Sequence, residues 1–266
     1  MANRNEIWCI AHRGARKEAP ENTRAAFERA LHYPIDGIEL DVQMTVDGVP
    51  VLFHDSTLLR VGGGRKRIAG LTYARLQTLN WAERFHPNAA PEPLMRLEQL
   101  LPFFSRSPRL LIEIKSHPKE RADGHTARLT QKVIAMITGP ESSAWQDRLY
   151  ILSFDPGVLR RAHDLAPHLK KVLNITGRES FDEIEDTHHL WAIDLGIGRL
   201  NQSWVHWARS RDLRILCYTC NGPRQVAKAL RLDIDGIISD RPDWLTRHLG
   251  REGNDLPPAM PGDIKA

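Results

Sequence analysis

The chain has 266 residues, 41% of them hydrophobic, and its 37 basic and 33 acidic residues give a formal net charge of +4. This size suits one large core, since α/β barrels of about 200 to 250 residues commonly form a single domain. The charge is too small and too scattered for a nucleic-acid-binding protein, and the N-terminal region has no apolar stretch typical of a signal peptide or membrane span. We expect a cytoplasmic protein without stable membrane insertion; the oligomeric state is not predicted.

Short apolar runs rich in β-branched residues predict eight buried strands, and helical periodicity separates most of them. Helix starts are indicated where proline follows Asp155, Gly222 and Arg241. A strand followed by a helix, repeated about eight times, predicts a (β/α)8 TIM barrel of the α/β class. An open doubly wound sheet is the alternative, but the turn after the first strand lacks a G-x-G-x-x-G motif. The predicted strands are 7–12, 37–42, 110–115, 149–154, 170–175, 191–196, 213–219 and 235–240.

The region after the second strand departs from this pattern. Residues 43–55, QMTVDGVPVLFHD, contain Asp47-Gly48 and predict a β-hairpin that returns His54 to a position roughly opposite Asp41. The following segment loses strand periodicity, and short helices are expected near 72–82 and 94–104. We expect residues 45–109, the hairpin and a small insertion, to lie over the barrel mouth.

The domain boundaries follow from these patterns. One TIM-barrel domain is expected over residues 1–249, and the polar, proline-rich residues 250–266 predict a flexible tail.

Acidic side chains occur at the ends of two predicted strands. Glu39 and Asp41 share one face of the second strand, and Glu113 shares a face of the next with Lys115. The C-terminal ends of the strands carry the functional residues of a TIM barrel. Three carboxylates in an apolar setting need a neutralising cation, and an oxygen-only set favours Mg²⁺ or Ca²⁺.

Two histidines and two further cations accompany these carboxylates. His12 and Arg13 end the first strand, His54 returns on the hairpin, and Lys115 ends the strand after it. Histidine exchanges protons near neutral pH, and the two cations would bind an anion. Together with a metal ion, these groups favour phosphoryl chemistry.

The blocks AHRGARKEAPENT, ELDVQMTVDGVPVLFHD, LIEIK and DGIISDRPD resemble the signature blocks of the glycerophosphodiester phosphodiesterases, from Ile10 to about Leu249. The resemblance implies a phosphoinositide phospholipase C-like barrel with a small insertion after strand 2. It also implies metal-dependent hydrolysis of a small-molecule glycerophosphodiester to sn-glycerol 3-phosphate and an alcohol. The implied roles are acid and base for His12 and His54, metal ligands for Glu39, Asp41 and Glu113, and phosphate binding for Arg13 and Lys115.

Three further residues are placed at the substrate by the same resemblance. Glu21 and Asn22 belong to the ENT block and support the site from the first loop. Tyr218 stands in YTCN, where the family usually has W-T-V-N, so the preferred alcohol is left open.

Two routes of hydrolysis fit these residues. Attack by the 2-hydroxyl of the substrate would form a cyclic phosphate that water then opens, whereas direct attack by metal-bound water would skip it. We favour the first route because the hydroxyl is already in place, with His12 as base and His54 as acid. A lysophospholipase D-type enzyme and a non-catalytic barrel that binds glycerophosphodiesters are the alternatives.

Other residues have structural interpretations. Cys217 and Cys220 are expected on opposite faces of a strand as reduced side chains. Trp204 and Trp207 fit a packed helix face, and His163, His188 and His189 are interpreted as surface residues without companions at ligand spacing.

Overall fold

The computed structural model describes residues 7–82, 85, 91–100, 108–142, 144–184 and 186–251. Nine strands of this part of the chain form one sheet in the order β1-β9-β8-β7-β6-β5-β4-β2-β3, and pairing of β1 with β2 closes it. All the pairings are parallel except β2 with β3, so the predicted TIM barrel is confirmed. The strands are β1 Trp8–His12, β2 Gly37–Met44, β3 Pro50–Leu52, β4 Leu110–Ile114, β5 Leu149–Ser153, β6 Lys170–Ile175, β7 Ala192–Gly196, β8 Arg214–Tyr218 and β9 Gly236–Ser239.

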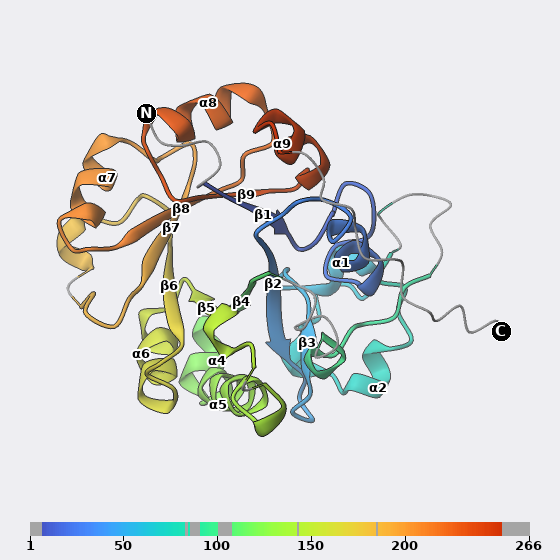
Figure 1. Cartoon of the computed structure of the whole chain (residues 1–266). Coiled ribbons are helices and arrows are strands. Elements are labelled where there is room, and N and C mark those ends of the chain that lie inside the picture. Colours follow the sequence, from blue (N-terminus) through green and yellow to red (C-terminus); the bar gives the residue numbers. More distant parts are fainter. Residues whose placement is uncertain are drawn as a thin grey trace.

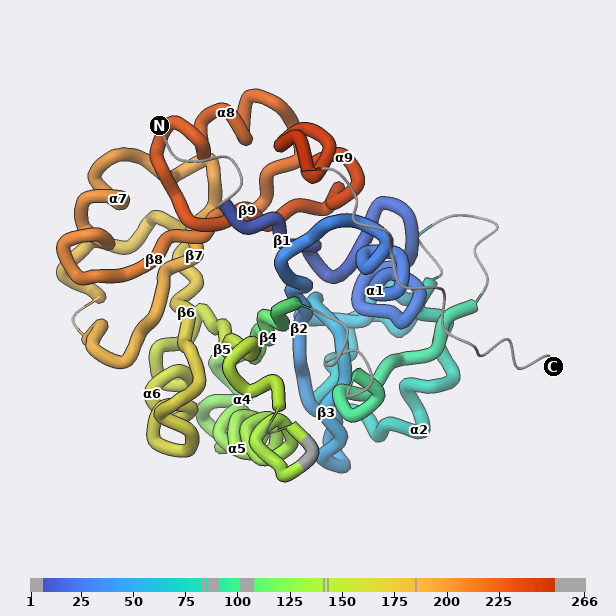
Figure 2. Tube along the Cα trace, in the orientation of Figure 1, coloured from blue at the N-terminus to red at the C-terminus, as the bar shows by residue number. Residues whose placement is uncertain are grey.

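Helices lie around the outside of the barrel, and the first strand meets the last one (Figures 1 and 2). Helices begin where the proline signals predict them, after Asp155, Gly222 and Arg241. The α-helices are α1 Arg24–Ala30, α2 Tyr73–Leu76, α4 Pro118–Ala122, α5 His125–Ile137, α6 Pro156–Leu165, α7 Gln202–Arg209, α8 Pro223–Arg231 and α9 Pro242–His248. The short 3₁₀ helices are η1 Leu58–Val61, η2 Ile68–Gly70, η3 Leu97–Leu100, η4 Pro140–Ser142, η5 Gln146–Arg148 and η6 Phe181–Glu183.

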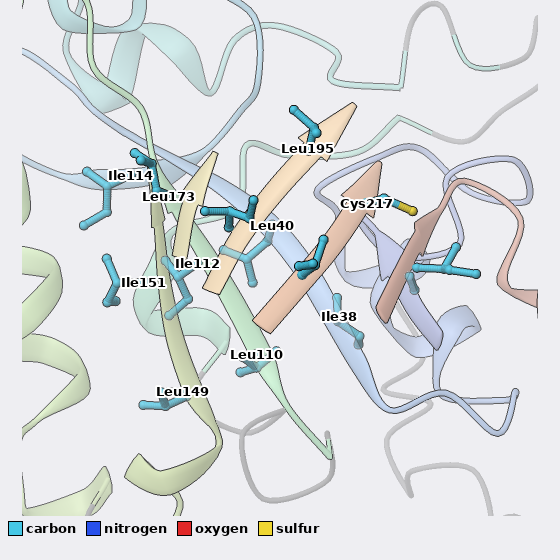
Figure 3. Close-up of a cluster of buried hydrophobic side chains, with 14 of the residues drawn as sticks. Ile38, Leu40, Leu110, Ile112, Ile114, Leu149, Ile151, Leu173, Leu195 and Cys217 are labelled. Carbon is cyan, nitrogen blue, oxygen red and sulfur yellow. The ribbon is translucent and has the colours of Figure 1, made fainter. Parts of the chain in front are cut away.

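Alternation along the strands divides the apolar side chains into two layers. The outward layer packs between barrel and helices, and Figure 3 shows part of it, including Leu40, Ile112 and Ile151. Trp204 and Trp207 are buried in the same layer, as predicted for a packed helix face. The inward layer consists of Ile10, Leu111, Tyr150, Leu152, Val172, Ala192, Leu216 and Ile238.

Three aromatic rings close the N-terminal end of the barrel. Trp8 stacks on Trp191 with ring centroids 5.2 Å apart, and Tyr150 contacts both rings edge-on. Because this end is filled and the strand centres are apolar, inward-pointing polar side chains collect at the C-terminal ends of the strands.

The predicted hairpin is present, with Val42 paired to Leu52 in an antiparallel register. The register places Phe53 opposite Asp41, whose carbonyl accepts a 3.1 Å hydrogen bond from the Phe53 N–H, and His54 follows directly. Gly48 has φ +81°, as its hairpin turn requires.

The insertion after β3 packs beside β2 and β3 around its own apolar cluster (Figure 1). The helix expected over 72–82 is wrong beyond Leu76. The Leu76 carbonyl accepts the Leu79 N–H and the Trp81 indole N–H, each at 3.1 Å, in place of the residue 80 N–H that a longer helix would supply. The second expected helix is reduced to η3, and residues 101–107 lie outside the described residues. The cluster comprises Val51, Phe53, Leu58, Val61, Ile68, Leu76 and Leu94.

The prediction for the two cysteines is partly wrong. β8 ends at Tyr218, so strand alternation does not extend to Cys220, and the Cys217 and Cys220 sulfur atoms lie 3.5 Å apart in the core. Both are buried free thiols, as expected for reduced side chains.

The end of the described chain is anchored. Arg251 pairs with Asp36 and donates to the carbonyls of Ile7 and Pro34, so the predicted tail does not begin before it. Residues 252–266, the rest of that tail, lie outside the described residues. None of the described helices has both the length and the apolar character needed to cross a membrane.

Candidate active site

Glu39, Asp41 and Glu113 converge at the C-terminal ends of β2 and β4, as the sequence predicts. The parallel register aligns Asp41 with Glu113. Glu39 lies two residues before Asp41 on β2, so its side chain points to the same inward face. Each carboxylate offers an oxygen within 4.8 Å of the others, and all three side chains are buried.

Burial and crowding shift the pKa values of these acids in different directions. Burial, followed by the charges of Asp41 and Glu113, raises the pKa of Glu39, and burial also raises the pKa of Glu113. Burial opposes ionisation of Asp41 too, but Lys115 and Arg13 outweigh it and hold its pKa below the ordinary value.

The donor set fits a hard divalent cation. All the donors are carboxylate oxygens, and Glu39 forms no ion pair with lysine or arginine within the described ranges. A buried carboxylate without such a partner is costly unless a metal ion or a proton neutralises it. Oxygen donors suit Mg²⁺ or Ca²⁺ better than zinc.

The two predicted phosphate-binding cations lie against these carboxylates. Lys115 Nζ is 2.7 Å from Asp41 Oδ1 and 2.5 Å from Glu113 Oε1, and Arg13 Nε is 3.0 Å from Asp41 Oδ2. Asn22 Nδ2 donates to the same Asp41 oxygen at 2.9 Å and its Oδ1 accepts from the Asp41 N–H, so Asn22 orients Asp41.

The two histidines have different surroundings. His12 is largely buried, with 13% of its side chain exposed; its Nδ1 lies 2.5 Å from Asp240 Oδ1, and its Nε2 lies 3.8 Å from Glu39. Burial lowers the pKa of His12, although the Asp240 hydrogen bond raises it in part. His54 is half-buried, and its Nδ1 is 2.9 Å from Asp55 Oδ1.

Glu21 connects the first loop to the insertion. Its carboxylate pairs with Arg13 at 3.0 Å, with Arg16 at 2.5 Å and with Arg60. Arg60 in turn pairs at 2.7 Å with Asp55, the partner of His54. Glu21 therefore links the loop that carries Arg13 to the segment that carries His54.

A cavity of about 280 Å³ brings both histidines and the acidic groups to one space. Residues 56–100 of the insertion do not line it in the described part of the chain, whereas Tyr218 does. Tyr218 donates its hydroxyl to the Ile175 carbonyl at 3.1 Å and contacts Phe154 edge-on, with ring centroids 6.2 Å apart. The lining consists of His12, Arg13, Arg16, Glu39, His54, Glu113, Leu152, Phe154, Asn174, Asp194, Tyr218, Thr219 and Ile238.

Two polar groups of this cavity were missed in the sequence. Asn174 and Asp194 are aligned neighbours on β6 and β7, and each has a buried Oδ1 without a hydrogen-bond partner among the described residues. Burial, followed by the charge of Glu113, raises the pKa of Asp194. Both residues follow an inward apolar residue by two positions, so the strand-end rule applied to Glu39 could have found them.

Asp240 was also missed as the partner of His12. It follows β9 directly and lies in the block DGIISDRPD. That block contributes to the family resemblance, but the resemblance gave Asp240 no role.

The prediction for the remaining histidines is wrong for His189, which is buried. Asp186 lies 2.5 Å from His188 Nδ1 and 3.3 Å from His189 Nδ1, and the His163 ring lies nearby. The loop before β7 and the end of α6 bring these residues together, which spacing along the sequence does not show.

Comparison with known proteins gives concordant results over most of the chain. Residues 12–244 match the Glycerophosphoryl diester phosphodiesterase family. A glycerophosphodiester phosphodiesterase of Bacillus altitudinis is 30% identical over 241 residues, which cover 88% of this chain and 94% of that protein.

Solved structures agree on the fold. A protein from Silicibacter pomeroyi superposes with a TM-score of 0.80 at 26% identity, covering 93% of this chain and 95% of that one. A phosphodiesterase of Oleispira antarctica, solved with its product sn-glycerol 3-phosphate, has a TM-score of 0.76 at 24% identity and covers 91% and 96%.

Proposed function

The chain belongs to the glycerophosphoryl diester phosphodiesterase family, and we propose that it hydrolyses glycerophosphodiesters to sn-glycerol 3-phosphate and an alcohol with two histidines and a divalent cation. One observation carries the details of the proposal. His12, His54 and the carboxylates of Glu39 and Glu113 face the same cavity of about 280 Å³. A phosphodiester in that cavity would meet an acid, a base and a cation site together.

The proton transfers are assigned to the two histidines. Asp240 forms a hydrogen bond with Nδ1 of His12, so Nε2 is available to the substrate. Asp55 forms the equivalent hydrogen bond with Nδ1 of His54. His12 accepts the proton of the 2-hydroxyl as it attacks phosphorus, and His54 donates a proton to the leaving alkoxide. Water then opens the cyclic phosphate with the roles reversed. Attack by a hydroxyl of the substrate itself avoids the entropy of bringing in a second molecule.

The charged groups around them hold the phosphate. Glu39, Asp41 and Glu113 would hold Mg²⁺ or Ca²⁺, which supplies charge neutralisation at the phosphoryl oxygens. Arg13 and Lys115 pair with Asp41, and we expect them to bind the phosphate beside the carboxylates. Glu21 and Asn22 position Arg13 and Asp41, and Tyr218 lines the wall opposite as a substrate contact.

The proposal is tested by measuring release of glycerol 3-phosphate from glycerophosphocholine. Metal-stripped protein should be inactive, and Mg²⁺ or Ca²⁺ should restore it. His12→Ala and His54→Ala should each lose at least about 100-fold in kcat, the usual contribution of a general acid or base. His206→Ala removes an exposed histidine of α7 and should behave as the wild type.

Choline release, measured alongside with glycerophosphocholine and with lysophosphatidylcholine, distinguishes the alternatives. Turnover of lysophosphatidylcholine but not of glycerophosphocholine would favour a lysophospholipase D-type activity, and turnover of neither would contradict the proposal. Cytoplasmic location and the absence of nucleic-acid binding stay predictions from the sequence.

A further inference from the structure

A second group of metal-ligating side chains lies at the opposite end of the barrel from the active site. Asp186, His188 and His189 belong to the loop between η6 and β7, and each offers a ligand atom within 4.8 Å of the others. His189 stands two residues before Trp191, whose ring helps to close the N-terminal end of the barrel. The barrel core therefore separates this group from the catalytic carboxylates.

One distance in this group matches that of a tetrahedral zinc site, and the other is shorter. Zinc bound at about 2.0–2.1 Å holds its ligand atoms roughly 3.3 Å apart. Asp186 Oδ1 lies 3.3 Å from His189 Nδ1 and 2.5 Å from His188 Nδ1. The His188 side chain is 78% exposed, so rotation of its ring can lengthen the shorter distance.

A third imidazole lies beside them. The His163 ring, on the last turn of α6, has its centroid 5.9 Å from that of His189 and 6.1 Å from that of His188, which are themselves 5.4 Å apart. Three imidazoles on one tetrahedral zinc ion have centroids about 5 Å apart by the same bond lengths. A small shift of His163 would make it a fourth ligand.

Two buried nitrogen atoms of this group have no partner. The His189 side chain is 2% exposed, and neither its Nε2 nor the Nδ1 of His163 has a hydrogen-bond partner in the described ranges. Buried polar atoms are normally satisfied, so the unpartnered His163 Nδ1 is available as a metal ligand, whereas His189 would bind through the Nδ1 that faces Asp186. A cavity of about 250 Å³ is lined in part by Asp186 and His189 and gives an ion access to these two residues.

We propose that Asp186, His188, His189 and His163 form a zinc site that fixes the loop before β7 to α6. Three nitrogen donors and one oxygen suit Zn²⁺, whereas the all-oxygen set at the barrel mouth suits Mg²⁺ or Ca²⁺. Four protein ligands leave no open position, so the site is structural rather than catalytic. The inference is independent of the proposed function.

Zinc affinity of the full-length protein, measured by competition with a chromogenic chelator in excess Mg²⁺, tests the site. The wild type should hold one more zinc ion than His188→Ala, whose affinity there should fall at least tenfold. His188 is exposed, so this variant is expected to fold. Both proteins keep Glu39, Asp41 and Glu113, so the difference between them counts only the zinc bound at the proposed site. His206→Ala, an exposed histidine on α7, should bind zinc as the wild type does.

Two further readouts complete the test. Cobalt in the wild type should give the visible absorption of tetrahedral coordination, which His188→Ala should lack. Release of glycerol 3-phosphate by His188→Ala in Mg²⁺ should equal that of the wild type, which separates this result from any failure at the active site. Equal zinc affinity in the wild type, His188→Ala and His163→Ala would overturn the proposal.

Discussion

At the scale of single residues, the contact between Asp240 and His12 suits that histidine to its proposed role as the base. The carboxylate lies 2.5 Å from Nδ1 of His12, and its other oxygen accepts a 2.8 Å bond from Asn221. A carboxylate at Nδ1 keeps the proton on that nitrogen and turns Nε2 towards the cavity. We therefore expect Asp240 to be a positioning residue that acts through His12.

We expect Asp240→Asn to lower kcat on the order of 100-fold with little change in KM, because an amide can present its N–H group to His12 and favour the wrong tautomer. Steady-state kinetics on glycerophosphocholine measures both constants. Asp243→Asn, which changes a carboxylate paired with Arg247 on α9, is the matched control and should leave kcat unchanged. An unchanged kcat in Asp240→Asn would contradict the role given to Asp240.

Asp194 makes stability depend on pH in a specific direction. Its pKa is raised by burial, so the folded state keeps a proton that the unfolded chain loses once the pH exceeds the ordinary aspartate value of 3.8. The folded state then binds more protons, and stability falls as the pH rises from about 4 towards the folded pKa.

For metal-free protein we expect Asp194→Asn to be more stable than the wild type at pH 7 by about 1–3 kcal/mol, since the amide is neutral and its N–H group can donate to the unpartnered Asn174 Oδ1. Urea unfolding at pH 4 and pH 7 measures the difference. The gain should shrink at pH 4, and a gain that is constant with pH would count against an ionising Asp194.

At the scale of elements, the β2–β3 hairpin determines where His54 lies. Gln43 is buried on β2, and its Nε2 donates to the carbonyls of Phe53 at 2.8 Å and Asp55 at 2.9 Å. These two bonds hold the backbone on both sides of His54.

We expect Gln43→Met to lower kcat and to reduce the free energy of unfolding by about 1–3 kcal/mol, because two partly buried carbonyls lose their donor. Lys132→Met is the matched control: Lys132 Nζ donates to Gly48 O at the far end of the same hairpin, 2.8 Å away, and is exposed. It should leave kcat unchanged. Equal loss of activity in both variants would mean that the hairpin as a whole, rather than the Gln43 bonds, places His54.

The strands and the insertion differ in how far the sequence predicts them. Each barrel strand is a short, largely apolar run bounded by turn residues, so all eight are recognisable, and alternation places Glu39, Asp41 and Glu113 on inward faces. The insertion depends on contacts such as Trp81 with the Leu76 carbonyl, which override helical periodicity. Asp240 contacts His12, which is distant in sequence, and Asp186 contacts two histidines of its own irregular loop. Helical or strand periodicity in the sequence does not predict either kind of contact.

At the scale of the whole molecule, the two ends of the barrel differ in character. Its C-terminal end carries the carboxylates and the two histidines proposed as acid and base, and its N-terminal end is filled by Trp8, Tyr150 and Trp191. Substitutions at the filled end should therefore change stability, whereas substitutions at the open end should change catalysis.

Contacts between the first and last described residues lie at the pairing that closes the barrel. Arg251 pairs with Asp36, which also accepts a 2.7 Å bond from the Cys9 N–H, and Arg251 donates to the Ile7 carbonyl at 2.5 Å. These contacts lie where β1 meets β9, the last pairing needed to complete the sheet. A single domain over residues 1–249 stays a prediction, but its functional boundary should include Arg251.

A chain ending at Arg251 should accordingly be as stable as the full chain, whereas Arg251→Ala should lose about 1–3 kcal/mol, because the partly buried carbonyl and carboxylate partners lose a charged donor. Urea unfolding of both proteins provides the measurement. Arg247→Ala is the matched control: its pair with Asp243 is exposed, and surface pairs contribute only about 0–1 kcal/mol. If Arg251→Ala were no less stable than Arg247→Ala, the contacts of Arg251 would not help to close the barrel, and the flexible tail would begin at residue 250.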